Sequence, residues 1–299
     1  MIARIIIIMQ DIGIATFLML LWKDTYGPET IPPDPVPVAD PNTPKAQAPV
    51  PPDAEPWRRW PRPPGGFIDL GCGNGLLTHI LISEGYTGYG FDLRARTSWT
   101  HYPQTTQSHL LVRALDPTAP TKNSPMNHRQ QIFRDPISSS QPPDTGNNNE
   151  EEEKAIGTIY NGGEGGSHDC VEDPVDDLLP TGCFLIGNHA DELTPWIPLL
   201  ATRYLASGYL SIPCCAWSFD ARFDRARDAP FCAVDTESLN LGAEGAAGSS
   251  YALYRVWLAA LSVHCGWAVE VEMLRIPSTR NWAIVGEFES LFLSLLRVS

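Results

Sequence analysis

Apolar residues from position 67 onward occur in short runs that are separated by glycines and polar turns. The runs FIDL and GYGFD have the length of buried strands, and the stretch LLTHILISEG between them predicts a helix. The pattern continues with CFLIGN, YLSIPCC, a helical period over Ser250–His264, and the runs WAVEVEMLRI and NWAIVGEF. Strands that alternate with helices predict an α/β fold with a mostly parallel sheet covered on both faces. Because only PSTR separates the last two runs, we expect them to pair as an antiparallel hairpin.

Residues 1–27 form an apolar segment at the start of the chain. A membrane-spanning helix needs about 20 continuous apolar residues, and Gln10 and Asp11 interrupt this run. The interruption also disagrees with the continuous apolar core of a signal peptide. We therefore expect a capped helix with Asp11 near its N-terminus, whose wide apolar face docks on the domain and does not enter a membrane.

Two low-complexity stretches set the expected domain boundaries. Residues 28–64 are rich in proline, which lacks the N–H that a helix or a sheet ladder needs, so they predict a linker. Residues 65–290 then form one domain, which a second stretch at residues 118–177 interrupts. That stretch is rich in Ser, Asn, Gly, Pro and Glu and too polar to bury, so we expect a disordered acidic insertion.

The net charge of −14 argues against a nucleic-acid partner only until its distribution is considered. Between Asp144 and Asp177, eleven acidic residues and one lysine carry −10, which leaves −4 for the rest of the chain. Arginine groups outside this stretch are therefore able to form a local phosphate-binding face. These groups are Arg58, Arg59 and Arg62; Arg94 and Arg96; and Arg222, Arg225 and Arg227.

The seven cysteines are odd in number and contain no C-x-x-C pair. This pattern argues against a disulfide framework and against a zinc ribbon. We therefore expect no metal site and a reducing, cytoplasmic location. The adjacent Cys214 and Cys215 are expected to be neutral small residues at a strand end.

A glycine-rich turn joins the first strand of the domain to its first helix. The segment DLGCGNG places Asp69 before Gly71, Gly73, Asn74 and Gly75. Glycines at this point let a ligand approach the backbone, and the helix start offers free N–H groups. The acidic-x-Gly-x-Gly-x-Gly form resembles the first motif of methyltransferases that use S-adenosylmethionine (SAM) and differs from the G-x-G-x-x-G of dinucleotide enzymes. We expect SAM to lie over these residues.

Two further acids follow the next two strands. Asp92 ends the segment YGFD, 23 residues after Asp69, where a carboxylate is able to accept both ribose hydroxyls of SAM. Asp116 in LLVRALDP is expected to end the third strand on the adenine side. A turn-forming role before Pro117 is the alternative for Asp116.

Several ordered segments accompany the glycine motif: SEG at Ser83–Gly85, GYGFDLR at Gly88–Arg94, LIGNH at Leu185–His189, DELTPW at Asp191–Trp196, PCC at Pro213–Cys215 and LRIPSTR at Leu274–Arg280. Together with DIGIATFLMLLW near the N-terminus, they resemble the eukaryotic tRNA (uracil-2′-O-)-methyltransferase family. Compared with that family, the chain starts close to the expected catalytic domain, and its C-terminal FESLFLSLLRVS has no Cys/His zinc finger. We therefore expect a shortened member.

The resemblance implies a Rossmann-like methyltransferase fold, SAM as the cofactor and serine tRNA as the partner. The implied reaction is methylation of the ribose 2′-hydroxyl of uridine 44 in that tRNA. Two alternatives stay open because a fold and a cofactor motif do not fix the acceptor. One is a SAM-dependent methyltransferase of another substrate, and the other is a truncated, non-catalytic SAM-fold module that binds RNA or a partner.

The attacking ribose hydroxyl must lose its proton, so a positioned base assists the reaction. The four lysines of the chain lie outside the predicted catalytic segments, which argues against a lysine base. The loop after the fourth strand offers His189 and Asp191 as candidate bases, with Asn188 orienting the ribose or SAM. A structural histidine and a helix-capping aspartate are the alternatives.

Arg275 and Arg280 flank PST between the last two strands. Their position favours contact with phosphate or with the developing alkoxide, because a guanidinium stabilises negative charge but does not accept a proton.

Overall fold

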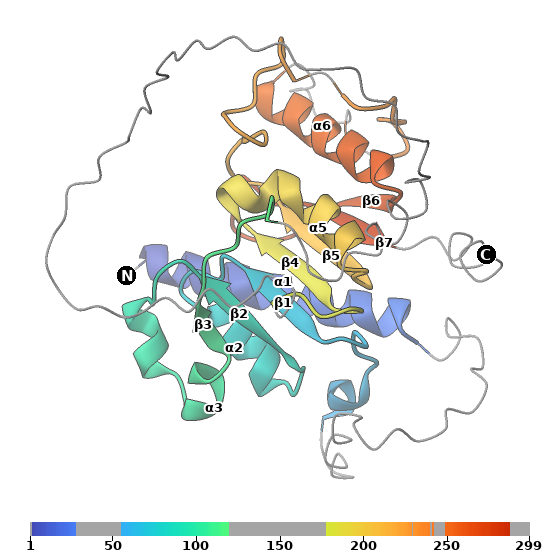
Figure 1. Ribbon diagram of the computed structural model, residues 1–299. Helices are drawn as coiled ribbons and strands as arrows, with labels where there is room; N and C mark the ends of the chain where they lie inside the picture. The colour runs from blue at the N-terminus through green and yellow to red at the C-terminus, as the bar shows by residue number, and fades with distance from the viewer. Residues whose placement is uncertain are drawn as a thin grey trace, which may run out of the picture. The chain divides into compact units, whose positions relative to one another are not determined.

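The computed structural model of the chain describes residues 2–27, 55–119, 178–228, 230–239, 241 and 249–287 (Figure 1). All of these residues belong to one structural unit. Most of the expected linker, residues 28–54, lies outside the described residues. Nearly all of the expected insertion, residues 120–177, also lies outside them.

Within the described residues, seven strands form one sheet in the order β3-β2-β1-β4-β5-β7-β6. Neighbouring strands among β1 to β5 are parallel, and β7 lies antiparallel between β5 and β6. This arrangement confirms the predicted α/β methyltransferase fold with its terminal antiparallel hairpin. The strands are β1 (Phe67–Leu70), β2 (Gly88–Asp92), β3 (Leu110–Val112), β4 (Phe184–Asn188), β5 (Gly208–Ile212), β6 (Ala268–Met273) and β7 (Trp282–Glu287).

Helices connect and cover these strands. Because β1 and β2 are parallel, the chain must cross back between them, and α2 provides that crossing. The α-helices are α1 (Ile2–Thr25), α2 (Leu76–Ser83), α3 (Gln104–Gln107), α5 (Ile197–Arg203) and α6 (Ser250–His264), and short 3₁₀ helices are η1 (Pro56–Arg59), η2 (Thr97–His101) and η4 (Asp191–Trp196).

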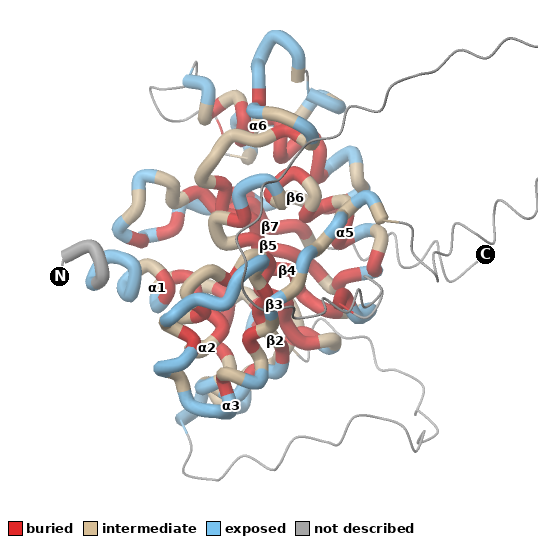
Figure 2. Tube along the Cα trace, turned by 60° about the vertical axis from the view of Figure 1, so that its left-hand side comes forward, coloured by how far each residue is buried: buried red, intermediate tan, exposed pale blue. Residues whose placement is uncertain are grey.

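Successive strand residues point to opposite faces of the sheet, and the inner strands β1, β4, β5 and β7 are buried on both faces. Phe67 and Phe184 pack with the apolar residues of α1 and α2 on one face. Ile68 and Leu185 pack with α5 on the other face, and α6 covers the β6–β7 end of the sheet. Figure 2 shows the strands β4, β5 and β7 as mostly buried, whereas the edge strands β3 and β6 are more exposed.

Helix α1 begins at Ile2, so the expectation that Asp11 lies near a helix N-terminus is wrong. The apolar residues before Gln10 extend the helix upstream, and Asp11 lies in its middle with 6% exposure. By length and hydropathy the stretch Ile5–Thr25 would suffice to cross a membrane. Its downstream half nevertheless enters the core, where Trp22 packs against the rings of Phe67, Tyr86 and Phe184.

The strand register collects several loops at one edge of the sheet. Ser211 near the end of β5 pairs with Ile284 near the start of β7, and Met273 at the end of β6 pairs with Trp282. The β6–β7 loop, residues 274–281, therefore lies at the carboxyl edge of the parallel strands. The turns after β1, β2, β4 and β5 lie at this edge too, which is where open α/β sheets bind their ligands.

Candidate functional site

The glycine turn after β1 has a backbone that ordinary residues rarely adopt. Gly71, Gly73 and Gly75 have φ values of 68°, 53° and 77°. A Cβ on Gly75 would also lie 2.9 Å from Leu110 and 3.2 Å from the indole nitrogen of Trp99. Glycine is therefore required here by both conformation and space. Asn74 completes the turn, since its Oδ1 accepts the N–H of Leu76, the first residue of α2, at 2.7 Å.

Asp69 supports this turn from inside the sheet. Its side chain is buried, and Oδ2 accepts a hydrogen bond from the Thr78 hydroxyl of α2 at 2.8 Å. Burial raises the pKa of Asp69 to about 7, and the nearby carboxylates of Asp11 and Asp92 act in the same direction. Asp69 therefore connects β1 to α2 beneath the glycine turn and does not face solvent.

Asp92 lies at the end of β2, beside the glycine turn, as the sequence predicts. One carboxylate oxygen accepts the N–H of Gly73 at 3.0 Å, and the other accepts the N–H of Arg94 at 3.2 Å. The Arg96 guanidinium lies 3.4 Å from the second oxygen. The carboxylate is thus fixed next to the glycine turn, at the carboxyl edge of the sheet.

The turn is braced by η2, a contribution that sequence reasoning did not find. Trp99 donates its indole N–H to the carbonyl of Gly73 at 2.9 Å. Ser98 and Tyr102 donate their hydroxyls to the carbonyl of Asn74 at 2.8 and 3.1 Å. The polar and aromatic residues of TSWTHY were a weak signal, because nothing in their spacing indicates which backbone they contact.

Asp116 does not end the third strand, so the position expected for it is wrong. β3 stops at Val112, and Asp116 lies in an exposed turn four residues later. Its carboxylate accepts hydrogen bonds from the N–H and the hydroxyl of Thr118, and these bonds lower the pKa of Asp116. Such local bonds are the ordinary chemistry of an aspartate before proline.

The loop after β4 holds its three candidate residues in different surroundings. His189 and Asp191 both have positive φ, 57° and 44°, which turns the chain sharply at the sheet edge. Asp191 begins η4 but makes no capping bond with its side chain, and it is exposed. Burial lowers the pKa of His189, which favours the neutral imidazole, while the charge of Asp191 acts in the opposite direction.

Helix α1 adds two polar residues to this loop, and neither was predicted as a site residue. Gln10 Nε2 lies 2.7 Å from His189 Nε2, and Asn188 Nδ2 donates to Asp11 Oδ1 at 3.4 Å. The Asn74 side chain also hydrogen-bonds the Asp11 carboxylate, whose pKa burial raises to about 6. The available signal was the polar pair itself, because an otherwise apolar helix retains buried polar residues only where they have partners.

Three groups with metal-binding atoms meet beside η4. The Cys214 thiol donates to Asp191 Oδ1 at 3.1 Å, and the ligand atoms of Asp191, Cys214 and Cys215 all lie within 4.8 Å of one another. Structural zinc sites take four protein ligands. The grouping therefore does not form a complete structural site within the described residues, and it leaves the Asp191 carboxylate engaged by a thiol.

Arg275 and Arg280 lie in the β6–β7 loop, at the same sheet edge as the glycine turn. The Arg280 guanidinium lies 3.8 Å from the centre of the Tyr251 ring on α6, a cation–π contact that holds this charge in place. Tyr251 in turn donates its hydroxyl to the carbonyl of Pro213 at 2.9 Å. Arg275 is exposed. The loop therefore presents one positioned and one exposed guanidinium.

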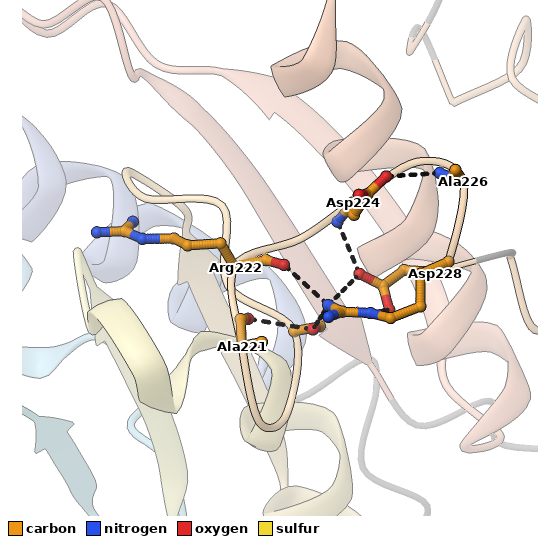
Figure 3. Close-up of polar contacts among 7 residues, drawn as sticks. Ala221, Arg222, Asp224, Ala226 and Asp228 are labelled. Carbon is orange, nitrogen blue, oxygen red and sulfur yellow. Dashed lines mark hydrogen bonds and ion pairs between the residues drawn. The ribbon is translucent and has the colours of Figure 1, made fainter.

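A cavity of about 480 Å³ lies between the β5–α6 connection and the start of α6, and three arginines help to line it. Arg227 is held within the wall, because it pairs with Asp228 at 2.8 Å and donates to Ser218 and to the carbonyl of Arg222. Figure 3 shows the Arg222 side chain extending away from this network.

The other two arginines of the cavity differ in their contacts. The guanidinium of Arg222 lies 4.2 Å from the centre of the Trp217 ring. Arg225 is exposed at the rim.

Comparisons with known proteins agree with this geometry. Residues 58–117, which contain the glycine turn and Asp92, match a family described as "Predicted AdoMet-dependent methyltransferase". This match supports SAM as the cofactor that the glycine motif predicts. No solved structure gives a significant match to the chain.

Longer similarity is found with curated proteins named tRNA (uracil-O(2)-)-methyltransferase. The chain is 32% identical over 279 residues to the protein from Schizosaccharomyces pombe, covering 93% of this chain and 41% of that relative. It is 33% identical over 284 residues to the Saccharomyces cerevisiae protein, with 93% and 41% covered. The Drosophila melanogaster protein, named as probable, is 30% identical over 230 residues, with 77% and 30% covered. The chain thus spans about 40% of the length of its fungal relatives.

Proposed function

We propose that this chain, which is 32–33% identical to tRNA (uracil-O(2)-)-methyltransferases over 93% of its length, acts as they are named and transfers the methyl group of SAM to tRNA. The acceptor in this proposal is the ribose 2′-hydroxyl of uridine 44 in serine tRNA. The observation that carries the proposal is the glycine turn Gly71–Gly75 with the Asp92 carboxylate fixed beside it. The acceptor follows from the family resemblance and not from the geometry.

The residues at the carboxyl edge fit SAM. In this proposal Asp92 accepts the ribose hydroxyls, and the glycines of the turn allow a ligand to approach the backbone closely. Two acceptors suited to the methionyl end are also present, because the Asn188 Oδ1 atom is buried without a hydrogen-bond partner and Asp11 lies beside it. SAM supplies a methyl group made electrophilic by the positive sulfonium.

Proton removal from the 2′-hydroxyl falls to the loop after β4. His189 is one candidate base, since burial favours its neutral form, although the Gln10 amide group lies 2.7 Å from its Nε2 and engages that nitrogen. Asp191 is the competing base, although the Cys214 thiol occupies one of its oxygens. Lys23 is the one lysine among the described residues, and it lies near the end of α1, where its ammonium faces the Trp60 ring. A lysine base therefore has no support in the described part of the chain.

We assign contact with the RNA backbone to arginines near the carboxyl edge of the sheet. Arg275 and Arg280 lie on the β6–β7 loop, and Arg222 and Arg225 line the cavity near the start of α6. Guanidinium groups bind phosphate through paired N–H donors. The acidic stretch between Asp144 and Asp177 lies elsewhere in the sequence, so the net charge of the chain does not oppose local phosphate binding.

The direct experiment incubates the 299-residue chain with SAM carrying a labelled methyl group and with transcribed serine tRNA. We expect label in serine tRNA and none in a control tRNA that lacks the matching uridine. Label in another nucleic acid or in a protein would favour a methyltransferase of another substrate. Binding of SAM and tRNA without transfer would identify a non-catalytic binding module.

A further inference from the structure

We propose that Asp11 of α1, together with Asn188 of β4, binds the α-ammonium group on the methionyl end of SAM. This inference rests on the proposed use of SAM and assigns a cofactor-binding role to a helix that precedes the methyltransferase motif by more than forty residues. The residue at the centre of the proposal, Asp11, is not one that the sequence pattern indicated.

The first observation is a buried carboxylate whose partners are neutral. Asp11 is 6% exposed, and its hydrogen bonds come from the side-chain amides of Asn188 and Asn74. Within the described ranges, no ion pair includes Asp11. A buried carboxylate is normally paired with a cation, because amides alone recover only part of the lost hydration. Asp11 therefore lies in a place where a positive ligand group would be stabilised.

The second observation is an unused acceptor next to this carboxylate. The Nδ2 of Asn188 faces Asp11 at 3.4 Å, while its Oδ1 is buried and has no hydrogen-bond partner. A buried carbonyl oxygen without a donor is costly, by about 1–3 kcal/mol. Exchange of the two amide atoms would not remove the problem, because Oδ1 would then face the acidic oxygen of Asp11. A ligand that brings N–H donors satisfies both groups.

The chemistry of SAM decides which of its groups fits. An ammonium carries a full positive charge and three N–H donors, and therefore matches one carboxylate and one carbonyl oxygen. The sulfonium is also positive but has no N–H, so it would leave Asn188 Oδ1 unsatisfied. The ribose hydroxyl of the acceptor offers a single proton and no charge. Of these groups, the ammonium is the one that pairs with the Asp11 carboxylate and also donates to Asn188 Oδ1.

The fold holds Asp11 rigidly enough for this role. Gln10, which precedes Asp11 in α1, contacts the residue after Asn188: its Nε2 lies 2.7 Å from Nε2 of His189. Two residues after Asp11, a Cβ on Gly13 would lie 2.7 Å from the Ile276 side chain, so α1 closely approaches the β6–β7 loop. From Ile14 onward the helix is anchored in the core. Asp11 is thus fixed between the glycine turn and the β4 loop.

The test measures affinities of three ligands by calorimetry, with the full chain and its Asp11→Asn variant. SAM has both the ammonium and the sulfonium, S-adenosylhomocysteine has only the ammonium, and 5′-methylthioadenosine has neither. Asn keeps the size of Asp and removes its charge. We expect the variant to bind SAM and S-adenosylhomocysteine about 10- to 100-fold more weakly, with 5′-methylthioadenosine unchanged. Asp24→Asn, in an exposed position of the same helix, is the matched control and should alter none of the three.

Three results would overturn the assignment. Weaker binding of SAM alone would show that Asp11 faces the sulfonium. Unchanged binding of SAM and S-adenosylhomocysteine would remove Asp11 from the cofactor site, and equal weakening of all three ligands would indicate a general distortion of the site. If the wild-type chain binds none of the ligands, the proposed function itself fails. That outcome is distinguishable because it does not depend on the variant.

Discussion

Individual carboxylates at the sheet edge differ in what surrounds them, and these surroundings suggest different tasks. Asp92 accepts two backbone N–H groups, whereas Asp69 and Asp11 are buried and have raised pKa values. Asp191 is exposed and bonded to a thiol. The sequence indicated Asp69 because it begins the glycine motif, and Asp92 and Asp191 because one ends a strand and the other follows a strand. It did not indicate Asp11, because a helix pattern does not show which face meets a loop that lies 177 residues away in the chain.

At Asp92, we expect substitution by alanine to weaken SAM binding by about 1.5–3 kcal/mol, through loss of hydrogen bonds to a charged group. Calorimetry on the isolated protein measures this change. Glu272→Ala, at an exposed position of β6, is the control and should leave the affinity as it is. Full affinity in a folded Asp92→Ala variant would exclude this residue from the cofactor site.

The buried Asp11 also predicts how stability depends on pH. Its pKa is about 6 in the folded chain against 3.8 for the free side chain, so the folded state favours the protonated form. This contribution is fully present below about pH 4 and is lost as the pH rises through 6, a loss of about 3 kcal/mol. In addition to burial, the charge of Asp11 raises the pKa values of two neighbouring groups, Asp69 and Tyr102. Because the pKa of Asp69 is likewise raised, ionisation of Asp69 also lowers the stability of the fold as the pH rises.

Urea unfolding at pH 4.5 and pH 7 checks this prediction in the absence of SAM. We expect Asp11→Asn to lose less stability than the wild type between these two values, because its amide does not ionise. Identical pH dependence in both proteins would contradict the buried, ionisable state of Asp11.

The two candidate bases are separated by single-turnover methyl transfer. If Asp191 accepts the proton, Asp191→Asn should lower the rate by about 10²-fold with SAM affinity nearly unchanged. If His189 accepts the proton, His189→Ala should give that loss of rate. The wild-type rate should then rise with pH as the imidazole loses its proton, and the rise should occur below the ordinary pKa of histidine, because burial lowers the pKa of His189. Activity in both variants would show that the loop has a structural role. Arg275 and Arg280 would then be the next residues to test, as groups that stabilise the developing alkoxide.

Among the elements, the strands and the long C-terminal helix follow from the sequence. FIDL, the glycine turn, Ser250–His264 and the final hairpin lie where their patterns place them, since length, periodicity and turn residues are local properties. Helix α1 was recognised as apolar but its start was misplaced. The polar pair at Gln10 was taken as a boundary, although it is an internal contact with the β4 loop. The position predicted for Asp116 was wrong for a related reason. The third strand was expected to end at Asp116, but β3 ends at Val112.

The docking of α1 has a direct consequence for stability. Trp22 is fully buried among three aromatic rings, so Trp22→Ala should destabilise the fold by about 3–5 kcal/mol through loss of packing and formation of a cavity. Leu20→Ala on the exposed side of the same helix should change stability by no more than about 0.5 kcal/mol. Chemical unfolding compares the two, and equal effects would show that α1 does not pack on the sheet in solution.

On the scale of the whole molecule, charge is distributed unevenly along the sequence. The acidic residues concentrate between Asp144 and Asp177, outside the described residues, while Arg275 and Arg280 lie at the ligand edge. We expect Arg275→Ala and Arg280→Ala each to weaken tRNA binding and to lower the salt dependence by about one phosphate contact. Arg58 is the control, because it contacts the Ser83 carbonyl at the far end of α2. An equal loss on Arg58→Ala would contradict a binding face at the carboxyl edge.

The most direct test of a ribose methyltransferase is the position of the transferred methyl group. Alkali cleaves RNA only where the 2′-hydroxyl is free, so labelled serine tRNA should give label in an alkali-stable dinucleotide that begins with uridine 44. A transcript with cytidine at that position should take up no label. Label recovered on the uracil ring of a mononucleotide, or at another nucleotide, would contradict the proposed reaction.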